Sequence, residues 1–146
     1  MKSMNELNFI FASNDGITLT SGHFGDAEKY YFYKIFENGL IEFDCIIENK
    51  FKNTDESTAH GSKQKRQSIV SSLSENIDFI VASKMSPNFN KINANTKICP
   101  IVSKMINIDE CLDYLKNNIR DLYEIKTIKS ENKKVEIINI KKENKI

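Results

Sequence analysis

The chain alternates short apolar runs with polar stretches, and this pattern predicts a protein built from both strands and helices. Three continuous apolar runs, each bounded by turn-forming residues, have the length and composition of buried strands. Three other segments repeat their apolar residues at helical spacing, and Pro87 stands where a helix can begin. The predicted strands cover residues 8–13, 77–83 and 98–102, and the predicted helices cover residues 62–75, 87–94 and 108–120.

A β-hairpin is predicted between the first strand and the first helix. Residues 30–36 and 40–48 are rich in aromatic and β-branched residues, and they flank the tripeptide Glu37-Asn38-Gly39. Asn-Gly between two such runs favours a tight hairpin turn, because both residues tolerate positive φ. Within the second strand, strict alternation would place Cys45 on the same face as Phe43 and Ile47, in the core.

This order of elements predicts an α/β domain whose mixed five-stranded sheet has helices packed on it. Right-handed crossovers would put the first strand in the centre, with the hairpin on one side and the later strands on the other. Pro100 has no N–H group, which places residues 98–102 at a sheet edge. An exposed edge there would allow a second copy to pair, so a homo-oligomer is expected to be accessible.

The C-terminal residues follow a different pattern. Residues 1–120 are predicted to form the domain and residues 121–146 a C-terminal extension, with seven Lys against three Glu from Lys126 onward. Apolar and polar residues alternate on both sides of Ser130-Glu131-Asn132-Lys133, which would suit an extra β-hairpin. A solvated tail suits the composition equally well, and a basic patch for an anionic partner is a third interpretation.

Composition excludes several classes of protein. The chain has 146 residues, the size of one domain, and a formal net charge of +1, which argues against a protein built for nucleic acid. Three cysteines, Cys45, Cys99 and Cys111, form no close pair and predict reduced thiols rather than a disulfide framework or a CxxC motif. Because neither a membrane span nor a clear signal peptide is evident, a cytoplasmic protein without a membrane partner is expected.

The segment with the most chemical content lies between the first strand and the hairpin. It reads Asn14-Asp15-Gly16 and then, after five residues, Gly22-His23-Phe24-Gly25-Asp26. Glycines on both sides of His-Phe permit sharp turns and close approach to a ligand. Phe24 would anchor the loop in the core while His23 points outward. A neutral imidazole is a good iron ligand, and neighbouring N–H groups can bond cluster sulfides.

The run FASNDG followed by SGHFGDAEKYYFYKI resembles the start of the dinitrogenase iron–molybdenum cofactor biosynthesis family, the NifX-like proteins. The resemblance covers roughly residues 8–119. It implies a ribonuclease-H-like three-layer fold, and binding or escort of an iron–sulfur cluster or an iron–molybdenum cofactor precursor. It also implies a protein that donates or accepts that cofactor as the partner. His23 is then the candidate metal ligand, with Gly22, Phe24, Gly25 and Asp15 around the cofactor.

Two other positions bear on this prediction. His60, in a polar loop just before the helix expected at residues 62–75, could supply a second metal ligand or stand as an exposed loop histidine. Residues 84–88, where many relatives have a glycine-bearing turn, read Lys-Met-Ser-Pro-Asn. Pro87 removes one N–H donor there, so that turn is a poor anion cradle.

An enzyme is not expected. A nuclease on this fold would need several carboxylates converging on divalent metal ions, and Asp15, Asp44 and Asp78 are the only tempting set. Asp15 ends one strand and Asp78 begins another, so they should lie at opposite edges of the sheet. The alternative to a cofactor carrier is a metal-free protein-interaction or regulatory module on the same fold.

Overall fold

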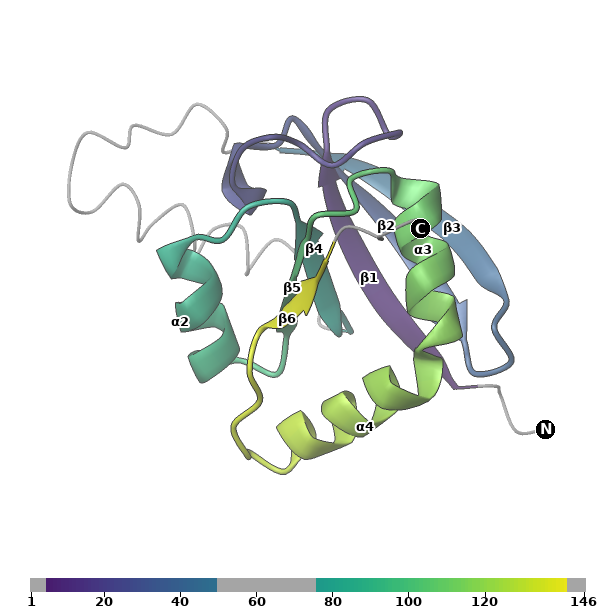
Figure 1. Ribbon diagram of the computed structural model, residues 1–146, viewed down its shortest axis with the longest axis vertical. Helices are drawn as coiled ribbons and strands as arrows, with labels where there is room; N and C mark the ends of the chain where they lie inside the picture. The colour runs from purple at the N-terminus through teal and green to yellow at the C-terminus, as the bar shows by residue number, and fades with distance from the viewer. Residues whose placement is uncertain (1–4, 50–75, 142–146) are drawn as a thin grey trace.

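A computed structural model describes residues 5–49 and 76–141, and in them a six-stranded mixed sheet is flanked by helices (Figure 1). The strands lie in the order β3-β2-β1-β4-β5-β6. Their bounds are β1 Glu6–Ser13, β2 Lys29–Phe36, β3 Ile41–Glu48, β4 Phe79–Ala82, β5 Cys99–Ser103 and β6 Ile138–Ile140. The helices are the short 3₁₀ helix η1 Phe24–Asp26, then α2 Pro87–Asn95, α3 Ile108–Asn117 and α4 Ile119–Ser130. The predicted helix at residues 62–75 lies outside the described residues.

The predicted hairpin is confirmed. Strand β2 pairs antiparallel with β1 on one side and with β3 on the other, and the chain reverses between β2 and β3 at Glu37-Asn38-Gly39. Strand β1 is central in the whole sheet, as predicted. The N–H of Phe36 donates to the carbonyl of Leu40 at 2.8 Å and closes the turn. Of the two turn residues expected to have positive φ, only Gly39 does, at +91°. The loop thus follows the three-residue hairpin pattern, in which the last position requires glycine.

Helices cover both faces of the sheet, which is parallel from β1 to β6. Strands β1, β4, β5 and β6 run parallel to one another. Phe89 and Ile92 of α2 pack on one face, whereas Ile108, Cys111, Leu112 and Leu115 of α3 and Leu122 of α4 pack on the other. The result is the three-layer α/β fold that was predicted, with one hydrophobic cluster on each side of the sheet. No helix among the described residues is long and apolar enough to cross a membrane.

The β-hairpin suggested for the C-terminal residues is wrong, and the sheet has six strands where five were predicted. Residues 119–130 form helix α4, and only residues 138–140 form a strand, which pairs parallel with β5. The alternation that suggested a strand also fits a helix, since Leu122 and Lys129 are seven residues apart and are both buried. Residues 119–130 form a helix because a helix allows both of these side chains to pack on the rest of the domain.

Pro100 does not mark the edge of the sheet. Strand β5 lies between β4 and β6, so the edge expected at residues 98–102 is covered. Pairing with β6 involves only Ile101–Ser103. The N–H of Cys99 donates toward β4, to the carbonyl of Asp78 at 2.8 Å, so the nitrogen of Pro100 faces the β6 side. Because β6 pairing begins one residue later, the missing donor of Pro100 costs the sheet no hydrogen bond.

Strict alternation also fails in β3. The pairing with β2 shifts between Phe32 and Tyr33, so that Phe32 faces Cys45 while Tyr33 faces Phe43. A bulge of this kind inserts one extra residue, here Asp44, and turns the residues before it to the other face. Cys45 therefore packs against the α2-side cluster, and the ring of Phe43 meets that of Tyr33 on the α3 side at 5.3 Å.

Candidate functional site

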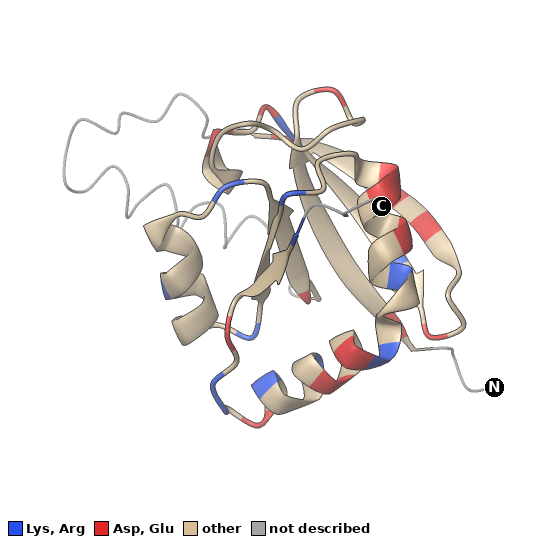
Figure 2. Cartoon of the chain, viewed as in Figure 1, with Lys and Arg blue, Asp and Glu red and all other residues tan. Residues whose placement is uncertain are grey.

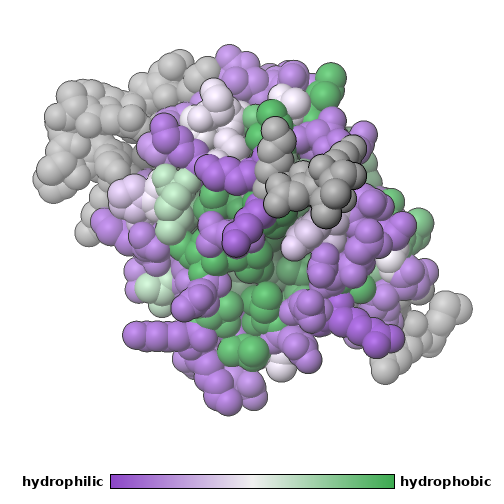
Figure 3. Space-filling view, in the orientation of Figure 1, coloured by the Kyte–Doolittle hydropathy of each residue, from purple (hydrophilic) through white to green (hydrophobic). Residues whose placement is uncertain are grey.

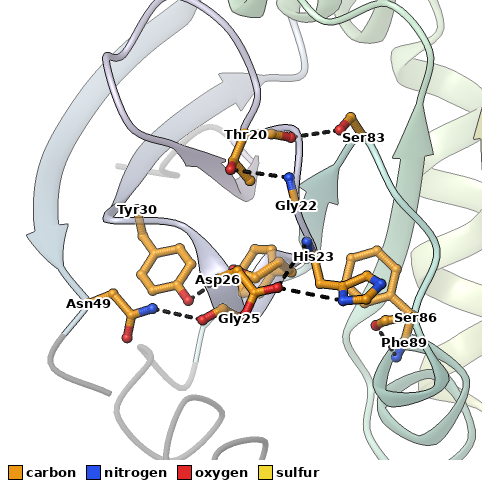
Figure 4. A network of polar contacts seen from close by, with 11 residues as sticks. Thr20, Gly22, His23, Gly25, Asp26, Tyr30, Asn49, Ser83, Ser86 and Phe89 are labelled. Atoms are coloured by element: carbon orange, nitrogen blue, oxygen red, sulfur yellow. Dashed lines mark hydrogen bonds and ion pairs between the residues drawn. The ribbon is translucent and has the colours of Figure 1, made fainter. Parts of the chain in front are cut away.

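The loops that follow β1 and β4 meet at one edge of the sheet. Because β1, β4 and β5 are parallel, their carboxyl ends lie at the same edge. From there the chain leaves β1 toward β2 on one side and leaves β4 toward α2 and β5 on the other. Ligands of open α/β sheets bind where neighbouring connections diverge in this way. Residues 14–28, including the glycine-flanked His23, lie at this edge (Figure 4).

The first part of this loop is a turn organised by Asp15. Its Oδ1 accepts the N–H groups of Ile17 and Thr18, both at 2.9 Å, and these bonds hold the pKa of the carboxyl below its usual range. Gly16 has φ +78°, and a Cβ there would lie 2.8 Å from the ring of Tyr31. Asp15 was predicted to lie around the cofactor, and in this structure its carboxylate accepts backbone N–H groups within the turn.

His23 is positioned by Asp26. The backbone N–H of His23 donates to Oδ2 of Asp26 at 3.3 Å, and the N–H of Asp26 donates to the carbonyl of His23 at 2.9 Å. The same Oδ2 lies 3.5 Å from Nδ1 of the imidazole. Both side chains remain about half exposed, 43% for His23 and 44% for Asp26. The imidazole is therefore fixed at its base and open to solvent at its outer edge.

Phe24 anchors the loop, as the sequence predicted. Its side chain is 4% exposed, stacks on Tyr30 at 4.8 Å between ring centres and touches Phe89 of α2 at 5.9 Å. The hydroxyl of Tyr30 donates to the carbonyl of Phe24 at 3.0 Å. On the other side, Nδ2 of Asn49 donates to the carbonyls of Gly25 and Ala27 at 2.9 and 2.8 Å. The backbone around His23 is thus held from both β2 and the end of β3.

The loop is also tied to β4. The hydroxyl of Ser83, just after β4, donates to the carbonyl of Thr20 at 2.6 Å, and the N–H of Gly22 donates to Oγ1 of Thr20 at 3.3 Å (Figure 4). In the same view the His23 ring extends toward the start of α2, where Ser86 accepts the N–H of Phe89 and caps the helix. His23 therefore sits between the two diverging connections.

Residues 6–118 match the family described as dinitrogenase iron-molybdenum cofactor. The chain belongs to the dinitrogenase iron–molybdenum cofactor family. The matched residues run from the start of β1 to the end of α3, so α4 and β6 lie beyond them. Membership confirms the family resemblance and indicates a role connected with the iron–molybdenum cofactor of dinitrogenase. A search of curated proteins found no match.

The sequence selected His23 and its neighbours as candidates but did not point to the residues that hold them in place. Asp26 could have been found from the sequence, because a carboxylate three residues after the N-cap of a helical turn, here His23, has the spacing of a capping box. Ser83 and Asn49 give no local signal, because they meet the loop only after the sheet has formed. Gly22 and His23 use their N–H groups inside the loop, whereas those of Phe24 and Gly25 have no acceptor within residues 5–49 and 76–141.

Thiolates are poorly placed to hold a metallocofactor of this family. Cys99 and Cys111 are buried, and burial raises the pKa of both thiols, to about 11 for Cys111. Cys45 is partly exposed, and burial followed by the charge of Asp44 raises the pKa of its thiol. Among the described residues, no three His, Cys, Asp or Glu side chains come together as a metal site. His60 lies outside the described residues.

The cysteines offer a simple check of this arrangement. We expect iodoacetamide at pH 8 to modify Cys45 at least tenfold faster than Cys99 or Cys111, because only Cys45 is open to solvent. Mass spectrometry of peptides after timed quenching measures the three rates. Repeating the reaction in guanidinium chloride should make them similar. Equal rates in the native protein would contradict the burial of Cys99 and Cys111.

Two cavities lined by described residues lie elsewhere. One, about 590 Å³, is at the amino ends of β1 and β4 and is lined by Asn8, Asp78 and Lys126, among others. The other, about 840 Å³, lies between the end of α2 and the residues after α4, with Lys97, Lys133 and Lys134 in its wall. Neither is lined by His23. These two cavities are therefore not part of the His23 site.

Proposed function

We propose that this chain carries an iron–sulfur-type metallocofactor or its precursor as cargo, with the His23 imidazole as the protein ligand. The observation behind the proposal is the placement of His23. The imidazole stands at the carboxyl edge of β1 and β4, between two diverging connections, and is about half exposed. Membership in the dinitrogenase iron–molybdenum cofactor family supports a metallocofactor as the cargo.

The chemistry of the donor set fits such a cargo. Imidazole nitrogen is a good ligand for iron, and N–H groups can bond the sulfides of a cluster. The carboxylate of Asp26 lies 3.5 Å from Nδ1, on the inner side of the ring. A carboxylate beside one ring nitrogen favours the proton there and leaves the other nitrogen, Nε2, as the donor to the metal. The N–H groups of Phe24 and Gly25 are the backbone donors available beside it.

The proposed role is transfer rather than catalysis. One exposed imidazole gives moderate affinity and lets a partner reach the cargo, whereas several thiolates would retain it. The protein that donates or accepts the cofactor would be the natural partner. Asp15 and Asp78 lie at opposite edges of the sheet, and Asp15 is engaged in its turn, so these carboxylates do not converge on a common metal position.

Anaerobic titration with a preformed iron–sulfur cofactor precursor tests the proposal directly. Visible absorbance and bound iron are followed after gel filtration of the full chain. We expect saturable binding with close to one cargo per chain. The second candidate is a metal-free interaction module, which the exposed apolar residues of β3 favour. Folded protein that leaves the column without iron at saturating precursor would reject the carrier role and favour that module.

A further inference from the structure

Strand β3 forms one edge of the six-stranded sheet. In the described residues it pairs only with β2, and its outer backbone groups have no strand beside them. The strand is eight residues long, compared with three for β6 at the opposite edge. The unpaired N–H and C=O groups of an edge strand can receive another strand. Its length makes β3 the better of the two edges for this.

Apolar side chains line β3 although it is exposed. Phe43 and Ile46 are each 49% exposed and Ile47 is 39% exposed. The register with β2 places Ile41, Phe43 and Ile46 on the α3 side of the sheet, opposite Ile35, Tyr33 and Tyr31. A strand added to β3 would extend this row, because cross-strand neighbours on one face contact each other. One face of the added strand should therefore be apolar.

All the charged residues of β3 are acidic. Glu42, Asp44 and Glu48 are exposed, and the strand contains no Lys or Arg. The whole hairpin at residues 29–48 has two lysines against four carboxylates, whereas the chain as a whole is +1. The neighbouring helix α3 adds Asp109, Glu110 and Asp113, and red positions mark this side of the molecule in Figure 2. Burial first, and then the charge of Asp109, raises the pKa of Tyr33, which lies beside Phe43.

These charges disfavour a second copy as the occupant. Pairing two β3 strands would bring three carboxylates from each copy into one strand pair, with no cation from either strand. Lys34 of β2, opposite Glu42, is already paired with Glu6 at 3.2 Å. Like charges on adjacent strands are destabilising. Charged residues, most often lysine, keep an edge strand from pairing with the same strand of another copy. In β3 the charged residues are acidic.

We propose that β3 receives an extended segment of a partner protein in which apolar residues alternate with lysine or arginine. The apolar face of that segment packs beside Phe43 and Ile46, and its basic face meets Glu42 and Asp44. Asn49 directly follows β3, and its side chain donates to the carbonyls of Gly25 and Ala27, two and four residues after His23. A strand docked on β3 therefore ends next to the His23 loop. That this partner exchanges cargo rests on the proposed function, whereas the docking itself does not.

The test uses the full chain free of iron and three blocked eight-residue peptides. One alternates valine and lysine, one alternates valine and glutamate, and one has four valines followed by four lysines. Isothermal titration calorimetry measures the affinities at low salt. We expect the alternating lysine peptide to bind at least tenfold more tightly than the other two. Its affinity should fall as salt is raised, because salt screens exposed charges.

Variants locate the binding. The double variant Glu42→Lys with Asp44→Lys should lose at least tenfold in affinity for the lysine peptide and gain affinity for the glutamate peptide. Ile106→Lys, at a residue that is 51% exposed and outside β3, should bind as the wild type does. Circular dichroism confirms that each variant is folded. The reversed preference of the double variant cannot arise from unfolding.

Three results with the peptides would overturn the proposal. They are equal affinity for the lysine and glutamate peptides, absence of binding to all three, and unchanged binding by the double variant. A dimer in sedimentation velocity that Phe43→Lys converts to monomers would assign the edge to a second copy instead. Since no iron is present, these results stand apart from the cofactor titration, and either proposal can fail while the other holds.

Discussion

Replacing His23 by alanine is expected to weaken binding of the iron–sulfur cargo at least tenfold, a loss of about 1.4 kcal/mol. The imidazole is the only described side chain at the proposed site with a metal-binding nitrogen, and the side chain of His23 is 43% exposed. The backbone should keep its form, because Phe24, Tyr30 and Asn49 hold the loop without the imidazole. Anaerobic titration of variant and wild type, followed by bound iron, measures the change.

His60→Ala is the matched control, since the chain has two histidines. If His23 alone is the ligand, His60→Ala binds like the wild type. A loss in both variants would support the second ligand that the sequence allowed. If His23→Ala retains the full affinity of the wild type, His23 is not the ligand. Asp26→Asn adds a finer test, because it keeps the size of the side chain while removing the charge beside Nδ1, and a loss of a few fold is expected.

The fold was largely predictable because its signals are local. The tripeptide before β3, the continuous apolar runs of β1, β4 and β5 and the helical spacing of α3 each depend on neighbours in the chain. The failures involve packing at a distance. Whether residues 123–129 become helix or strand depends on the surface that Leu122 and Lys129 meet. Strand β5 lies inside the sheet because β6 pairs with it. Strand β6 has only three residues and comes almost forty residues later in the chain.

The candidate site also combines features with a local sequence signal and features that depend on distant residues. Glycines beside a His-Phe pair mark a sharp loop, and Phe24 is buried as that pattern predicts. Asp15 was assigned to the cofactor, and Asp followed by Gly is also a common turn. Its carboxylate makes the bonds of that turn, and its role toward a cofactor stays a prediction. Ser83 and Asn49 come from strands on opposite sides of β1. Their contacts with the loop follow from strand order, which a local pattern does not contain.

Phe79→Ala is expected to lower the free energy of unfolding by about 3–5 kcal/mol, the usual cost of removing a buried phenylalanine ring. Phe79 is fully buried in β4, and its ring stacks on that of Phe9 in β1 at 5.0 Å with 14° between the planes. These strands form the parallel pair whose carboxyl ends carry the His23 loop. A cavity here would loosen the junction between the antiparallel and parallel halves of the sheet. Urea denaturation followed by circular dichroism gives the value, provided that the slope with denaturant is unchanged.

Phe43→Ala is the matched control, because it removes the same ring from β3, where it is 49% exposed and touches Tyr33 from one side. We expect a loss of about 1 kcal/mol, from partial burial and one edge-on aromatic contact. Equal losses in the two variants would show that the pair Phe9 and Phe79 contributes no more than an edge contact. A domain of this size has a total stability of about 5–15 kcal/mol, so Phe79→Ala should remove a large share of it. The weakened variant should then hold the His23 loop less firmly, and its affinity for cargo should fall even though no ligand has been changed.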